Sequence, residues 1–132
     1  MIDGHDMTIA HHEAGHAVAA LHFGRQVDFV GRDRHNGLTT YAPDVAEGDI
    51  KRYAIESGVI CLAPFFENTS GCAGDLATLD GLLAAGVNLS AVWSETAALV
   101  ADPEYRRRVR VLEQALWQHP VLSGVEVLLL LA

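Results

Sequence analysis

Apolar residues recur along this chain at the spacing of an α-helix, and residues that start or stop helices bound each run. Asp102 is a typical N-cap, Pro103 suits the first helical position, and Pro120 cannot continue a helix. One apolar stripe lies between them: Tyr105, Val109, Leu112 and Leu116. This pattern predicts a helix that packs one face against a core, and it directs the chain toward a mainly helical fold.

Similar patterns predict further helices and one pair of strands. The helices are expected over residues 7–23, 50–63, 75–83 and 89–101, with a short last one opened by the capping box of Ser123 and Glu126. Asp6 is the expected N-cap of the first helix. Asn36 and Gly37 lie between two β-prone runs, residues 27–30 and 38–41, which predicts a hairpin. The expected fold class is mainly α (α+β) with one small β-hairpin edge.

Length and charge narrow the possible functions. The chain has 132 residues, enough for one domain, which is expected over residues 1–132. Its formal net charge of −8 argues against nucleic-acid or anionic-membrane binding, because both need positive charge. The longest apolar run, residues 128–132, is far shorter than the roughly 20 residues that cross a bilayer, so no membrane insertion is expected. With no secretory leader expected, the cytoplasm is the predicted compartment.

The segment that carries chemistry is His12-Glu13-Ala14-Gly15-His16, an H-E-x-x-H motif inside the first predicted helix. Residues four apart share a helix face, so both imidazoles can bind one zinc ion about 2.0–2.1 Å from each nitrogen. Glu13 neighbours the first ligand and can act as a general base on a water beside the metal. The small residues Ala14 and Gly15 leave room for close packing behind the site. The motif therefore predicts a hydrolytic Zn²⁺ site.

A catalytic zinc site needs a third protein ligand and an open fourth position. The residue types leave six candidates: Asp75, Asp80, Glu67, His22, His35 and His119. Asp75 opens a predicted helix, where an N-cap role is the simpler interpretation. His22 lies six residues past His16, on another part of the helix. The pattern alone does not select the third ligand.

Taken together, separate segments of the chain resemble the peptidase domain of the FtsH family of membrane-bound AAA+ zinc proteases. In order they are IAHHEAGHA over residues 9–17, GLTTYAP over 37–43, TSGCAGDL over 69–76, and LEQAL over 112–116 with LSGVE over 122–126. The first is similar to the family's zinc helix, and the second to the strand beside which substrate is thought to lie. The third is similar to the loop whose aspartate is the third zinc ligand, and the last two to the closing helices.

The resemblance implies a zincin-like helical metallopeptidase domain with Zn²⁺ as cofactor. It makes His12, His16 and Asp75 the metal ligands and Glu13 the catalytic base. Glu67 falls near a family glutamate, which implies a role in orienting a ligand histidine. The implied substrate strand comprises Leu38, Thr39, Thr40 and Tyr41. The implied activity is a zinc-dependent endopeptidase that binds its substrate as an added strand.

The chain also departs from the family. The family's peptidase domain follows an ATPase module and a membrane anchor, and neither is expected here. The spacing from His16 to Asp75 is shorter, and Ala63-Pro64-Phe65 stands where the family has Gly-Gly-Arg, so Pro64 is expected to interrupt the helix. The expected substrates are therefore peptides or unfolded protein segments. The expected partners are a separately encoded ATPase or further copies of this chain.

Two other functions fit the same motif. A catalytically inactive zinc-binding module with a regulatory or scaffold role keeps the metal without turnover, and a closed fourth position filled by Cys72 or a histidine favours it. A dedicated processing peptidase shares the site and cuts one regulatory protein. Residues 127–131 are apolar on every side, so they are expected either to be buried or to support a contact with another chain.

Overall fold

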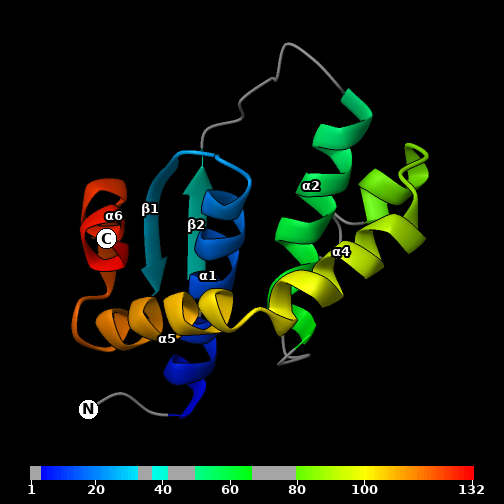
Figure 1. The fold of residues 1–132 in the computed structure, drawn as a ribbon. Helices are drawn as coiled ribbons and strands as arrows, with labels where there is room; N and C mark the ends of the chain where they lie inside the picture. Colours follow the sequence, from blue (N-terminus) through cyan, green and yellow to red (C-terminus); the bar gives the residue numbers. More distant parts are fainter. Residues whose placement is uncertain (1–3, 33–36, 42–49, 67–79) are drawn as a thin grey trace.

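The computed structural model describes residues 4–32, 37–41, 50–66 and 80–132 of the chain. In chain order the elements are α1 (Gly4–His22), β1 (Val27–Arg32), β2 (Gly37–Tyr41), α2 (Ile50–Leu62), the 3₁₀ helix η1 (Ala63–Phe66), α4 (Leu89–Ala101), α5 (Pro103–Gln118), β3 (Val121–Ser123) and α6 (Gly124–Leu131). Residues 80–84 are also helical. Helices predominate beside a small antiparallel sheet (Figure 1), which confirms the predicted mainly α fold with a β-hairpin.

The sheet has the strand order β2-β1-β3, and both pairings are antiparallel. The predicted hairpin is confirmed as β1 and β2, with Val30 opposite Thr39. β3 is a third strand that the sequence analysis did not predict, and it places Leu122 opposite Val30. β1 is therefore the central strand: β2 follows it directly in the chain, whereas β3 comes from a distant part of the chain.

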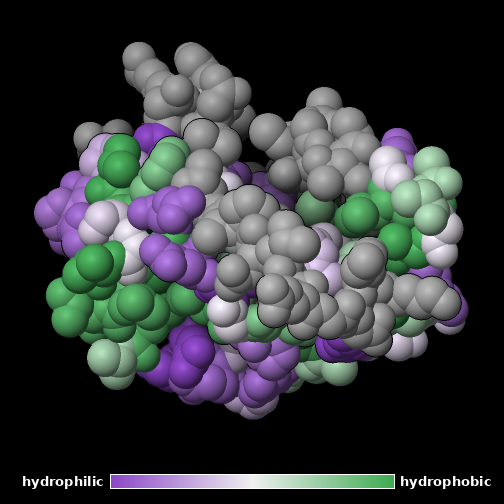
Figure 2. All heavy atoms as spheres, turned by 90° about the horizontal axis from the view of Figure 1, so that it is seen from above, coloured by the Kyte–Doolittle hydropathy of each residue, from purple (hydrophilic) through white to green (hydrophobic). Residues whose placement is uncertain are grey.

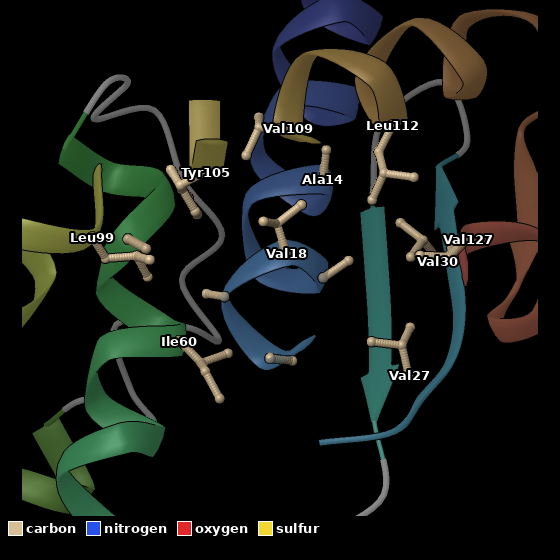
Figure 3. Close-up of a cluster of buried hydrophobic side chains, with 14 of the residues drawn as sticks. Ala14, Val18, Val27, Val30, Ile60, Leu99, Tyr105, Val109, Leu112 and Val127 are labelled. Carbon is tan, nitrogen blue, oxygen red and sulfur yellow. The ribbon is translucent and has the colours of Figure 1, made fainter. Parts of the chain in front are cut away.

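Helix α1 lies at the centre of the molecule. It packs against the sheet, α2 and α5, while α6 packs against β1 and α5 (Figures 1 and 3). Its neighbours approach closely because many of its buried positions are alanines, and the following five have no exposed surface: Ala10, Ala14, Ala17, Ala19 and Ala20. Figure 3 shows Val109 and Leu112 of α5 beside Ala14 and Val18 of α1. The central helix therefore carries the H-E-x-x-H motif into the interior.

Both ends of α5 are fixed by side chains. Asp102 accepts a hydrogen bond from a backbone N–H of the first turn (2.9 Å), and Pro103 begins the helix, as predicted. The predicted stripe is buried: Tyr105, Val109, Leu112 and Leu116. At the other end Arg32 donates to the carbonyl oxygens of Leu116 (2.6 Å) and Trp117 (3.0 Å). A β1 side chain thus satisfies carbonyls that a helix C-terminus leaves without donors.

The ends of α1, α2 and α6 show which of the predicted helix starts and stops are correct. The capping box of Ser123 and Glu126 is confirmed at the start of α6. The prediction of Asp6 as N-cap is wrong, because α1 begins at Gly4 and Asp6 lies in its first turn. Pro64 does interrupt the second helix, since α2 ends at Leu62 and continues as η1.

A buried arginine joins α2 to the end of α1. Arg25 is 4% exposed, and its guanidinium donates to the carbonyl oxygen of Tyr53 (3.1 Å) and to Ser57 Oγ (3.0 Å). The same guanidinium lies 4.0 Å from the centroid of the Tyr53 ring. These contacts fix the position of α2 relative to α1 and so relative to the motif.

Helix α6 is covered on one side only. Val127 and Leu131 are buried, whereas Val125, Leu128 and Leu129 are more than half exposed. Figure 2 shows the apolar surface on this side of the molecule. Among the described helices, none combines the length with the apolar character that a bilayer crossing requires.

Replacing Gly58 with alanine is expected to destabilise the contact between α2 and α4. A Cβ at this position would lie 2.9 Å from Val92 Cγ2 and 3.1 Å from Val92 Cγ1, and a buried β-branched side chain has little freedom to move. We expect Gly58→Ala to lower the free energy of unfolding by about 1–3 kcal/mol in urea titrations. The double variant Gly58→Ala/Val92→Ala should lose less free energy of unfolding than the two single variants lose together. The reason is that Val92→Ala removes the methyl groups with which the new Cβ would clash.

Candidate metal centre

The structure brings the three residues of the motif together in the interior. His12, Glu13 and His16 are each at most 6% exposed, and one potential ligand atom from each lies within 4.8 Å of the others. Within the described part of the chain, this is the one group of three or more such residues that could hold a metal ion. Three buried polar side chains in one place are costly unless a partner or an ion compensates them.

The two histidines face each other through the nitrogens that would bind a metal. His12 Nε2 and His16 Nε2 are 3.0 Å apart, and the rings meet at 86°. Two imidazoles on one tetrahedral zinc ion place their nitrogens roughly 3.3 Å apart. Two lone pairs at this distance repel, so the pair needs a proton or a cation between the rings. The residues therefore fit a zinc ion with only a small adjustment.

A backbone carbonyl determines how His16 presents its nitrogens. His16 Nδ1 lies 2.7 Å from the carbonyl oxygen of Ile60, near the end of α2. A carbonyl oxygen only accepts, so Nδ1 carries a proton and donates it. In the neutral ring Nε2 then holds the lone pair that faces His12. Metal-binding histidines in proteins are usually oriented in this way, by donating the N–H of the other ring nitrogen to a carbonyl or a carboxylate.

Strand β2 reaches the catalytic candidate Glu13. The Thr39 hydroxyl lies 2.8 Å from Glu13 Oε1 and 3.1 Å from the Glu13 carbonyl oxygen, with donor geometry toward both. The predicted substrate strand of Leu38, Thr39, Thr40 and Tyr41 does fall within β2. One of its side chains, however, contacts the carboxylate directly. The strand therefore positions Glu13 as well as bordering the motif.

The candidates for a third ligand divide into two groups. His22, Asp80 and His119 are described, exposed, and outside the cluster with His12 and His16. The other three lie outside the described residues: Asp75, Glu67 and His35. The assignment of Asp75 as third ligand, and of Glu67 as an orienting residue, therefore stays a prediction. Cys72 also lies outside the described residues.

Residues from η1 and α5 close the back of the motif. A Cβ on Gly15 would lie 3.1 Å from Pro64 Cγ and 3.2 Å from the Tyr105 hydroxyl, so glycine allows the close packing expected there. The Phe65 ring meets the edge of the His12 ring, with centroids 5.0 Å apart. Three groups of the site were not predicted from the sequence: Pro64, Phe65 and the Ile60 carbonyl. Only the helix-breaking proline gave a signal in the sequence.

In comparisons with known proteins, no protein-family model matches the chain and no curated protein matches it. The geometry of the site and the sequence patterns are therefore what indicates the function of the chain.

Proposed function

We propose that this chain is a zinc-dependent endopeptidase of the zincin type, related to the peptidase domain of the FtsH family. His12, His16 and Asp75 would hold the Zn²⁺ ion, and Glu13 would act as the general base. The proposed substrates are peptides or unfolded protein segments, delivered either freely or by a separately encoded ATPase. Assembly with further copies of the chain belongs to the same proposal.

One observation supports the proposal most. Two buried imidazoles direct Nε2 atoms at each other across 3.0 Å, and the outer nitrogen of His16 is held by a carbonyl. A hydrogen bond between the rings satisfies this arrangement without a metal, and a zinc ion would replace that proton and bind both nitrogens. The buried Glu13 beside the pair adds the proton acceptor that peptide hydrolysis requires.

The residues of the site divide the chemical work. A bound zinc ion supplies Lewis acidity, which polarises a carbonyl and lowers the pKa of a bound water to about 7. Glu13 can take a proton on its carboxylate and return it to the leaving amine nitrogen. Thr39 donates to Oε1 and holds that carboxylate in one orientation. All three motif residues are buried, and burial strengthens the electrostatic interactions among them.

The edge position of β2 supports binding of an extended substrate. Among the described strands β2 has a partner on one side only, since the order is β2-β1-β3. An extended peptide can pair with such an edge through backbone hydrogen bonds, which give affinity with little sequence preference. Because Thr39 of this strand contacts Glu13, a peptide added beside β2 would pass close to the base.

Zinc content and peptide cleavage test the proposal together. Elemental analysis of protein purified without added metal should give about one zinc per chain, and an unfolded protein substrate should be cleaved. His12→Ala should remove both, while His22→Ala, an exposed histidine on the same helix, should change neither. Asp75→Ala should weaken zinc binding at least tenfold, with Asp80→Ala as its control. Circular dichroism establishes that each variant is folded.

Each outcome selects one function. Zinc without cleavage of any unfolded substrate would favour the inactive regulatory or scaffold module. Cleavage restricted to one protein would favour a dedicated processing peptidase. Absence of zinc after titration of the folded protein would overturn the metallopeptidase proposal, and unchanged zinc binding in Asp75→Ala would overturn the third ligand alone.

A further inference from the structure

Pro64 lies where α2 changes into η1, and it is the fourth residue after Ile60. In an α-helix the carbonyl of a residue accepts from the N–H four residues later. Proline has no N–H, and its ring clashes with the carbonyl four residues before it. The Ile60 carbonyl therefore lacks the donor that a continuing α-helix would supply.

The Ile60 carbonyl meets His16 instead. His16 Nδ1 lies 2.7 Å from its oxygen, across the contact between α2 and α1. We infer that Pro64 is a positioning residue for His16: it frees the Ile60 carbonyl to hold the Nδ1–H and so turns Nε2 toward the zinc position.

The packing of Pro64 supports the same role. Its ring stands against Gly15, one residue before His16, close enough that a Cβ on Gly15 would be 3.1 Å from Pro64 Cγ. Pro64 is buried and η1 packs against α1. The residue that breaks the helix thus also sets the spacing between the carbonyl and the imidazole. The role in zinc binding rests on the proposed function, whereas the orientation of His16 does not.

The test restores the missing donor. Pro64→Ala and Pro64→Val each supply a backbone N–H to the Ile60 carbonyl, and valine keeps most of the buried volume. In metal-free protein, at a pH where the imidazole of His16 is neutral, ¹⁵N NMR should show His16 as the Nδ1–H tautomer. Both variants should show a mixture of tautomers, and their zinc Kd, measured by competition with a chelator, should rise about tenfold. Pro103→Ala is the matched control, because Pro103 occupies an exposed helix start, and it should change neither quantity.

The outcomes separate the inference from the function. Folded Pro64 variants that keep the Nδ1–H tautomer and the wild-type zinc Kd would overturn it, as would an effect in Pro64→Ala but not in Pro64→Val. If the wild-type chain binds no zinc, the proposed function fails, and the tautomer still decides the role of Pro64. Should both variants unfold, the unmodified chain decides: a scalar coupling between His16 Nδ1 and the Ile60 carbonyl carbon is expected, and its absence would contradict the inference.

Discussion

Glu13→Gln is expected to lower kcat for peptide cleavage by 10²- to 10⁴-fold, the usual contribution of a general base. Glutamine keeps the shape of the side chain and an oxygen that can accept from the Thr39 hydroxyl, which lies 2.8 Å from Oε1. It cannot take up the proton. Zinc content should stay near one per chain, and KM should change little, because the variant leaves the histidines and strand β2 in place.

The control for this prediction is Glu95→Gln, which changes the same chemical group on α4, where Glu95 pairs with Arg52. Its kcat should match that of the unmodified chain. A Glu13→Gln protein that contains zinc and retains more than about a tenth of the wild-type kcat would contradict the assignment of Glu13 as the base. Metal content measured on the same samples separates loss of zinc from loss of proton transfer.

Gly124→Ala is expected to be strongly destabilising, because Gly124 lies at the junction between the sheet and α6. Gly124 begins α6 directly after Ser123, and a Cβ there would overlap the carbonyl oxygen of Val27 in β1. Both groups belong to the backbone, so neither can rotate away. The junction of β1, β3 and α6 must open, and we expect the free energy of unfolding to fall by roughly 3 kcal/mol or more.

Urea and thermal unfolding measure this loss, and Gly81→Ala provides the control. Gly81 is exposed and helical, and within the described residues nothing lies within 4 Å of a Cβ there. Alanine is the better helix former, so Gly81→Ala should leave stability unchanged or slightly raised. Equal stability of Gly124→Ala and the unmodified chain would show that α6 does not approach β1 this closely.

Local signals in the sequence predicted the helices well, because caps act over a few residues. Asp102 and Pro103 set the start of α5, and Ser123 with Glu126 set the start of α6, where the structure has them. The start of α1 was misplaced because Asp6 suits the first turn as well as the cap. In each case the information lies within one helical turn of the residue concerned.

Long-range contacts could not be predicted in this way. β3 has only three residues, and it is a strand because Leu122 pairs with Val30 far earlier in the chain. The hydrogen bond from His16 to Ile60 could not be predicted either, since any residue type at position 60 supplies a carbonyl oxygen. Sequence patterns describe side chains, whereas this contact depends on where the backbone of α2 passes.

The motif itself was predictable because His12 and His16 share a face by helical geometry alone. The structure adds that this face is buried and that Thr39 contacts Glu13. A third ligand requires a segment from another part of the chain to reach the pair. The predicted third ligand, Asp75, lies outside the described part of the structure.

The order of the strands also bears on how the chain is made. β1 is complete after residue 32, but its partner β3 begins at Val121, so one edge of the central strand stays unpaired until residues 33–123 have also been synthesised. At roughly 5–20 residues per second, that interval lasts several seconds. α5, which covers α1, also emerges late. The histidine pair of α1 is therefore covered only once α5 has emerged, and the proposed zinc ion would find its buried setting complete only after that point.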